Sequence, residues 1–326
     1  MGFFTQTPNG AAASPPGSQV TIGDLTLLLS ILVSDILPVF AIAAAGFLLA
    51  RYAGADVRTV ARVVFYSLLP CLAFRLLVTS KASGGNAGRL MLLAVLIMGV
   101  MGLVGYIAGK SLGLDSKSLR AFMMVVMFSN GGNYGLPVVR FAFGAEALTY
   151  ATIFFLTGSV TTYVTSAFFA GSHRSKLAGA MEKIWKMPSL YGVALALLVL
   201  ALGRPVPEAV MRPVELLSDA ALPVMILVLG MQLERAARPA RPGLVLLAVV
   251  ISLVAAPLVA LGLSAAFGIT GAARQAAVIL SSMPVAVITT ILALEFELAP
   301  DFVTSAVFVS TLASPLTLAP LIAYLS

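Results

Sequence analysis

The stretch SNGGNYGLP, residues 129–137, interrupts a long apolar segment with four consecutive residues that favour turns. Glycine disfavours a helix by about 1 kcal/mol and proline by about 3 kcal/mol relative to alanine. Pro137 also lacks an N–H donor and steers Leu136 away from the α region. We therefore expect the helix to break before Pro137 and to restart there. The alternative is a simple proline kink that lets two helices cross.

The composition indicates an integral membrane protein. Of the 326 residues, 60% are hydrophobic and only 10% are charged, and the mean hydropathy is +1.04. A soluble fold of this length needs far more charged side chains to cover its surface, so lipid must cover this one. The net charge of +7 comes from basic residues scattered singly, which excludes nucleic acid as a partner. The single cysteine excludes an intramolecular disulfide and a cysteine-based metal cluster.

Ten apolar segments approach or reach the length of about 20 residues that a helix needs to cross the hydrocarbon layer. We therefore expect an all-α membrane fold with ten transmembrane helices. The expected spans are residues 25–50, 57–79, 90–109, 119–143, 147–170, 188–202, 209–231, 244–267, 273–294 and 302–325. Residues 1–24 are rich in Pro, Gly, Ser and Ala, and we expect them to form a disordered tail.

Lysine and arginine are distributed unevenly between the two ends of these spans, and basic ends stay in the cytoplasm. With an even number of spans, both termini should then lie outside the cytoplasm, in a multi-pass protein of the cell (inner) membrane. One face holds most of the 20 basic residues: Arg51, Arg58, Arg62, Lys110, Lys117, Arg120, Arg174, Lys176, Lys183, Lys186, Arg235, Arg238 and Arg241.

The longest connector, residues 172–187, is basic and is expected to be a cytoplasmic linker. It separates five spans in residues 25–171 from five spans in residues 188–326. Because five is odd, the second set must be inverted relative to the first. Weak echoes support a duplication, since LLPCLAFRL at 68–76 resembles ALPVMILVL at 221–229. Inverted repeats of this kind are a recurrent transporter architecture with a binding site at the centre.

A second break is expected in the ninth span, where Pro284 matches Pro137 of the fourth. Unwound backbone inside a bilayer is tolerated only where it is buried in protein or lines a wet cavity. The N-termini of half-helices attract anions, and asparagine amides can donate to a carboxylate. We therefore expect a metal-free site for a small organic anion, formed by Asn130, Gly131, Gly132, Asn133, Tyr134, Gly135, Pro137, Ser281, Ser282, Met283, Pro284 and Val285.

At this motif the sequence resembles the auxin efflux carrier family, which includes plant auxin exporters and bacterial malonate or malate carriers. The resemblance rests on Asn130 seven residues before Pro137 in the pattern N-x-x-x-x-G-L-P, followed by FAFGAEAL from Phe141. It continues in MPVAVITTILALEFELAPDFVTSAVF from Met283 and in VFYSLLPCLAF from Val64. It therefore covers nearly the whole chain after the tail.

The resemblance implies an elevator mechanism, in which helices one, two, six and seven form a scaffold and helices three to five and eight to ten a moving transport bundle. Crossed, broken helices four and nine would hold the substrate, with Asn130 as the carboxylate partner and Pro137 and Pro284 at the breaks. A homodimer through the scaffold helices is expected. Where plant members have glutamine after the ninth-span proline, this chain has Val285, which argues against auxin itself as substrate.

Two acidic residues lie well inside expected spans, where charges are costly, and two basic residues are placed deep enough to help neutralise an anionic substrate. Asp35 and Asp219 are candidates for proton coupling, or each lies near a helix end, paired or wetted; Asp35 could meet Arg75. Arg75 and Arg140 are candidate partners of an anionic substrate or, alternatively, interfacial anchors.

No Ser-His-Asp, Walker or HExxH arrangement occurs, so we expect neither enzymatic activity nor a cofactor. The expected partners are the small organic anion, membrane lipid and a coupling ion, H+ or Na+. Two alternatives stay open: a sodium-coupled symporter of the related bile-acid carrier type, and a membrane sensor that transports nothing.

Overall fold

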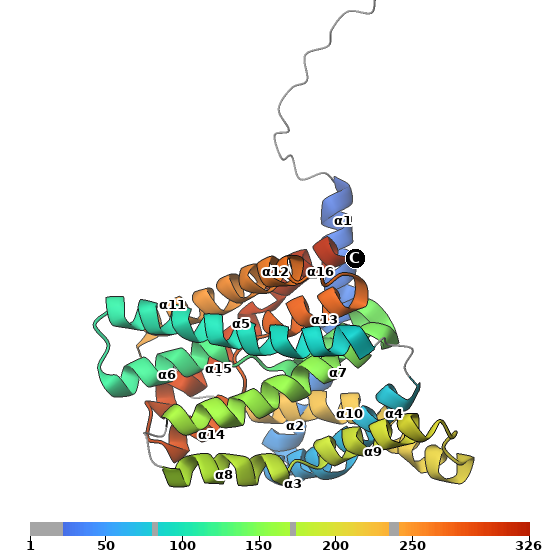
Figure 1. Ribbon diagram of the computed structural model, residues 1–326. Helices are drawn as coiled ribbons and strands as arrows, with labels where there is room; N and C mark the ends of the chain where they lie inside the picture. Colours follow the sequence, from blue (N-terminus) through green and yellow to red (C-terminus); the bar gives the residue numbers. More distant parts are fainter. Residues whose placement is uncertain (1–21, 80–83, 170–173, 235–240) are drawn as a thin grey trace, which may run out of the picture.

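The computed structural model is built of helices (Figure 1). Most of the expected tail, and Arg235 and Arg238 of the basic face, lie outside the described residues. The structure describes residues 22–79, 84–169, 174–234 and 241–326.

Six helical stretches within the described residues are long and apolar enough to cross a membrane. A pair bent by 50°, α15 (Pro300–Ala313) and α16 (Pro315–Leu325), adds a seventh if it counts as one span. Ten spans remain a prediction, because α9 has only 15 residues and several expected spans are interrupted. The six stretches are Thr26–Ala53, Val57–Thr79, Ala87–Ser111, Gly131–Ser166, Glu208–Leu233 and Pro242–Ala266.

One group of helices contains the first two expected spans and the sixth and seventh. Within it α10 packs against both α2 and α4, and α4 packs against α9. The members of this first helix group are α1 (Ile22–Ile31), η1 (Leu32–Ile36), α2 (Leu37–Ala53), α3 (Val57–Val63), η2 (Val64–Leu68), α4 (Leu69–Thr79), α9 (Pro188–Leu202) and α10 (Glu208–Leu233), where η marks a π-helical turn.

Glycines bring the helices of this group into backbone contact. Gly46 of α2 lies on the carbonyl of Leu227, and Gly230 of α10 lies on the carbonyl of Ala43, so that a Cβ at either glycine would overlap that oxygen. Small residues permit such close approach between membrane helices.

A second helix group contains the remaining helices. Here α5 packs against α6, α7 and α12, while α13 packs against α7 and α11 against α15. Its further members are α5 (Gly84–Ser111), α6 (Ser116–Met127), η3 (Gly131–Gly135), α7 (Leu136–Phe169), α8 (Arg174–Trp185), α11 (Pro242–Val250), η4 (Ile251–Ala255), α12 (Ala256–Ala266), α13 (Gly271–Ser281) and α14 (Ile288–Glu295), besides α15 and α16.

The long helix α7 covers parts of two expected spans. Its backbone is non-helical at Gly144, with φ 81° and ψ −162°, where the sequence predicts the turn between the fourth and fifth spans. Glycine adopts positive φ without steric cost. The basic linker, for its part, forms helix α8, which packs against α7.

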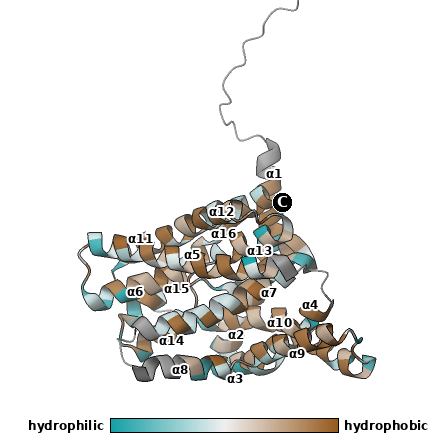
Figure 2. Cartoon of the chain, viewed as in Figure 1, coloured by the Kyte–Doolittle hydropathy of each residue, from teal (hydrophilic) through white to brown (hydrophobic). Residues whose placement is uncertain are grey.

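The outside of the molecule is apolar along the helices. Figure 2 shows hydrophobic residues over the long helices and hydrophilic residues gathered at their connections. Large apolar side chains are exposed, among them Leu103, Leu198 and Leu258. A surface of this kind is stable against lipid rather than water.

Candidate functional site

The break in the fourth expected span comes earlier than the sequence predicts. Helix α6 ends at Met127, Phe128 is extended with φ −102° and ψ 105°, and the chain turns back into a helix at Gly131. The prediction of a restart at Pro137 is therefore wrong. The turn η3 is π-helical, with hydrogen bonds between residues five apart, whereas α7 has bonds between residues four apart. Where one pattern changes to the other, one carbonyl is left without an N–H donor. The missing N–H of Pro137 is tolerated within this segment.

Glycines make this early restart possible. A Cβ at Gly132 would lie 2.9 Å from the ring of Phe155, and one at Gly135 would lie 3.1 Å from the side chain of Met283. A larger residue at either position would have to displace its neighbour. The helix begins where glycine permits close packing, not where proline would be favoured.

The break in the ninth expected span lies between α13 and α14. Helix α13 ends at Ser281 and α14 begins at Ile288. Pro284 lies in the non-helical stretch between them, so it also does not open the second half-helix. Its position differs from that of Pro137, which is helical and lies within α7.

The two breaks pair with each other as short antiparallel extended segments, with Ser129 opposite Val285. The amide of Asn130 donates to the carbonyl of Pro284 at 2.7 Å, and the amide of Ala286 donates to the carbonyl of Phe128 at 2.8 Å. Each break therefore supplies the hydrogen bonds that the other loses by leaving the helical conformation.

A cavity of about 890 Å³ lies beside the paired breaks. Of the twelve residues expected in the site, five line this cavity, namely Asn130, Gly131, Gly132, Asn133 and Ser281. The other seven do not line it; they are Tyr134, Gly135, Pro137, Ser282, Met283, Pro284 and Val285.

Asn130 stands out among the polar residues of the cavity. Only 6% of Asn130 is exposed, and its Nδ2 has no hydrogen-bond partner in the described part of the chain. The neighbouring groups are occupied, since Ser281 Oγ donates to the carbonyl of Ala277 at 2.7 Å and Asn133 Nδ2 donates to Gln232 Oε1 at 3.4 Å. A buried donor left unpaired costs about 1 to 3 kcal/mol, which a bound acceptor would recover.

Tyr134 is fully buried and has a packing role. Its hydroxyl lies 3.1 Å from Ser314 Oγ, and its ring meets Phe40 edge-on with centroids 6.1 Å apart. Phe40 belongs to α2, so this contact joins the two helix groups.

Sequence reasoning missed much of the cavity lining. Gln232 comes from α10, and Phe154, Phe155 and Thr162 come from α7, beyond the expected motif. An isolated glutamine near a span end and aromatic residues within an apolar helix give no distinctive pattern. Only the packing of separate helices shows that they share a cavity.

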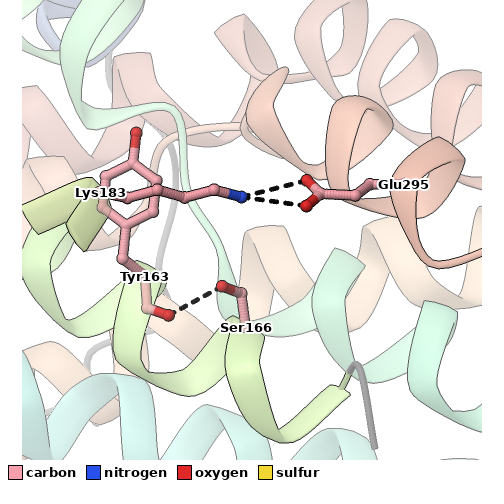
Figure 3. A network of polar contacts seen from close by, with 4 residues as sticks. All are labelled: Tyr163, Ser166, Lys183 and Glu295. Atoms are coloured by element: carbon pink, nitrogen blue, oxygen red, sulfur yellow. Dashed lines mark hydrogen bonds and ion pairs between the residues drawn. The ribbon is translucent and has the colours of Figure 1, made fainter. Parts of the chain in front are cut away.

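The mouth of the cavity carries charged side chains. Arg58 and Arg62 line it from α3, one helical turn apart, and Glu295 lines it from the end of α14. Lys183 Nζ of α8 lies 3.1 and 3.2 Å from the two carboxylate oxygens of Glu295 (Figure 3). Tyr163 of α7 also lines the cavity.

The charges predicted inside the spans lie away from this cavity. Arg75 forms an ion pair with Asp219, so the suggested pair of Arg75 with Asp35 is wrong. The close packing of α4 against α10 brings Arg75 to Asp219. Asp35 has no ion pair or hydrogen bond to any described residue, and Arg140 is exposed. None of these four residues lines the cavity.

Interrupted apolar helices that meet beside a cavity are a recurrent arrangement in membrane transport proteins. The chain belongs to the family described as Membrane transport protein, the family of the auxin efflux carriers, whose model matches residues 31–183 and 173–322. This confirms the family resemblance seen in the sequence.

Two archaeal proteins are similar over most of their length. An uncharacterized transporter of Methanothermobacter thermautotrophicus is 31% identical over 267 residues, which cover 81% of this chain and 87% of that protein. An uncharacterized transporter of Methanocaldococcus jannaschii is 27% identical over 269 residues, covering 79% of this chain and 86% of that protein.

Proposed function

We propose that the protein is a secondary transporter of a small organic anion such as a carboxylate. The observation that carries this proposal is the unpaired, buried Nδ2 of Asn130 at the wall of the cavity. An amide N–H is a donor and matches a carboxylate oxygen. A cation cannot accept a hydrogen bond from this N–H group, so it would gain nothing from the contact.

The helix that follows Asn130 strengthens the preference for an anion. The first helical hydrogen bond of η3 runs from the amide of Gly135 to the carbonyl of Asn130 at 3.0 Å. The amide of Gly131 donates to the carbonyl of Ser129 at 2.9 Å, whereas those of Gly132, Asn133 and Tyr134 have no carbonyl within the helix to bind and form its partially positive end. Gly131 and Gly132 bring this end to the cavity without side chains in the way. Two independent features thus favour negative charge at one place.

The two helix groups support an elevator-type movement. The first group corresponds to helices one, two, six and seven, and the second to the remaining six helices. Among the side-chain hydrogen bonds of the described residues, the one between Asn133 and Gln232 joins the groups beside the cavity. We propose that the first group is the scaffold and the second the transport bundle.

Corresponding helix contacts support two inverted repeats. In the first group, Gly46 of α2 abuts the backbone of α10, and Gly192 of α9 abuts the backbone of α4, where an added Cβ would lie 2.6 Å from the carbonyl oxygen of Pro70. In the second group, α5 packs on α7 as α11 packs on α15. If the first five spans are exchanged with the last five, the contact of α2 with α10 becomes that of α9 with α4. In the same way, the contact of α5 with α7 becomes that of α11 with α15. The ten-span fold rests on these matches.

The position of the mouth supports a cavity that opens to the cytoplasm. Arg58 and Arg62 belong to the basic face of the sequence, which stays cytoplasmic in multi-pass proteins. The contact of Phe40 with Tyr134 joins the two helix groups, and neither residue lines the cavity.

The proposal is tested first by ligand binding. The purified protein is heated with malonate, malate, succinate, lactate or indole-3-acetate, and a bound anion at about 100 times its Kd stabilises the protein by about 2.7 kcal/mol. Asn130→Ala should lose this stabilisation. Ser159→Ala is the matched control, because Ser159 also lines the cavity but its hydroxyl already donates to the carbonyl of Phe155 at 2.9 Å. Equal affinity in both variants would refute the Asn130 site.

Transport is tested separately with the anion that binds. Uptake into proteoliposomes, with and without a sodium gradient, distinguishes a uniporter or proton-coupled carrier from a sodium symporter. Binding without any movement of the anion would identify a sensor and contradict the proposed function.

A further inference from the structure

Glu295 is the one acidic side chain among the described residues that line the cavity. It is the last residue of α14, where the negative end of the helix dipole adds to its own charge. A bare carboxylate at this place would repel a negatively charged substrate at the mouth.

Lys183 neutralises this carboxylate. Its Nζ contacts both oxygens of Glu295 across the gap between α8 and α14 (Figure 3). The two side chains are 47% and 46% exposed, and an exposed ion pair contributes little to stability. Stability is therefore a weak reason for this pair. Its larger effect is on the electrostatic potential at the mouth.

With Glu295 neutralised, the charges left at the mouth are positive. Arg58 and Arg62 are both exposed and lie on the same side of α3, four residues apart. A cleft lined by charge of one sign concentrates ligands of the opposite sign and raises their rate of association. We call Arg58, Arg62, Lys183 and Glu295 the mouth cluster.

We propose that Lys183, by neutralising Glu295, sets the charge selectivity of the cavity mouth, so that anions are admitted and cations are repelled. This inference rests on the proposed anion transport and gives it a specificity determinant outside the Asn130 site. The opposite possibility is that Lys183 and Glu295 act as a mechanical latch that holds α8 to α14.

The two possibilities predict different signs for single substitutions. If the pair sets the potential, Lys183→Gln leaves a bare carboxylate and makes the mouth more negative. Glu295→Gln leaves a bare ammonium and makes it more positive, and the double variant returns to the starting value. If the pair is a latch, both single variants and the double variant have the same effect.

The potential is measured with charged thiol reagents at a reporter cysteine. Cys71→Ser removes the native thiol, and Ile291→Cys places a new one on the cavity wall one helical turn before Glu295. Ile291 is 55% exposed, so reagents reach it. The rates of modification by anionic sulfonatoethyl and cationic trimethylammonioethyl methanethiosulfonate are compared as a ratio. Leu294→Cys, also at the cavity wall, serves as a second reporter.

We expect the ratio of anionic to cationic rates to fall about tenfold in Lys183→Gln and to rise about tenfold in Glu295→Gln, since each reagent responds about threefold to one unit charge at this range. The double variant should lie within about twofold of the parent. High salt should reduce both shifts.

A matched control lies on the same helix. Lys186 and Glu182 of α8 form a pair at 2.5 Å that does not line the cavity, so Lys186→Gln should leave the ratio unchanged. Shifts of one sign in both single variants, an unrestored double variant, or an equal shift in Lys186→Gln would overturn the proposal. The measurement needs no substrate, so its outcome is independent of whether a carboxylate is found to bind or be transported.

Discussion

The amide N–H of Asn130 donates to the carbonyl oxygen of Pro284 at 2.7 Å, although the two residues belong to opposite halves of the chain. Each residue lies in a helix break, and an isolated break in an apolar interior would leave backbone groups unpaired. The two breaks are therefore stable only together. This mutual pairing fixes the side chain of Asn130 at the cavity wall, while its Nδ2 has no partner among the residues that the structure describes.

Ser310 should be important for the stability of this pairing. Its Oγ accepts a hydrogen bond from the amide of Val285 at 3.0 Å, inside the protein. Ser310→Ala leaves that buried amide without a partner, and we expect a loss of about 1 to 3 kcal/mol of stability. The measurement is the thermal unfolding midpoint of the purified protein.

The control for Ser310 is Ser305→Ala. Ser305 is buried on the same helix, but its hydroxyl donates only to the carbonyl of Asp301 at 2.7 Å. Removing it leaves no donor unpaired, so the midpoint should change less. Equal losses in the two variants would show that the bond to Val285 is unimportant.

The helical membrane class of the protein could be predicted from the sequence because composition and apolar runs are local properties. The position at which the helix restarts after the first break could not be predicted, because proline and glycine in the same stretch favour different starting points. Pro137 suggests a helix start, yet the helix begins at Gly131, and at the next residue, Gly132, an added Cβ would lie 2.9 Å from the ring of Phe155. Such a restriction comes from a distant part of the chain and leaves no mark on the local sequence.

Gly46 should be essential for the contact between α2 and α10. A methyl group at this position would overlap the carbonyl oxygen of Leu227, so Gly46→Ala must push the two helices apart. We expect a loss of about 1 to 3 kcal/mol of stability, typical of overpacking in a close-packed core.

Gly262→Ala is the control, because a Cβ there would meet no atom of the described residues within 4 Å. Since alanine is the better helix former, that control should be neutral or slightly stabilising, and a Gly46→Ala variant as stable as the parent would contradict the close approach.

Asp115 should make the start of α6 sensitive to acid. Hydrogen bonds from the hydroxyl and amide of Ser118, together with the nearby charge of Arg241, hold the pKa of the Asp115 carboxyl below its ordinary value of 3.8. A lowered pKa gives stability that is present above the ordinary value and is lost as the pH falls through the lowered one. Below about pH 4, hydrogen exchange of the Ser118 amide should therefore become faster relative to the intrinsic exchange rate of an unprotected amide at the same pH.

Asp115→Asn keeps the cap but removes the titrating group. Its Ser118 amide should stay protected over the same pH range. If the wild-type protein and this variant lose protection at the same pH, another group is responsible.

The candidate site shows a similar division between what could and could not be predicted. Asn130 lies in a motif with a recognisable pattern, and its place at the cavity agrees with the expectation. Gln232 and Glu295 have no pattern, and only the three-dimensional arrangement brings them to the same cavity. The ion pair of Arg75 with Asp219 depends in the same way on how α4 and α10 pack.

The contact between Phe40 and Tyr134 should separate if the two helix groups move against each other during transport. In a Cys71→Ser background, Phe40→Cys and Tyr134→Cys can be joined as a disulfide by a small diffusible oxidant such as iodine, since the two side chains are in contact and Tyr134 is too buried for a larger reagent. We expect the cross-link to abolish uptake of the transported anion, while the cavity mouth stays open and binding persists. Cross-linking Arg51→Cys with Glu234→Cys is the matched control, because these residues form a 3.3 Å ion pair within the first helix group. Uptake that survives the first cross-link, or that is lost equally with the second, would rule out relative movement of the two groups as the transport step.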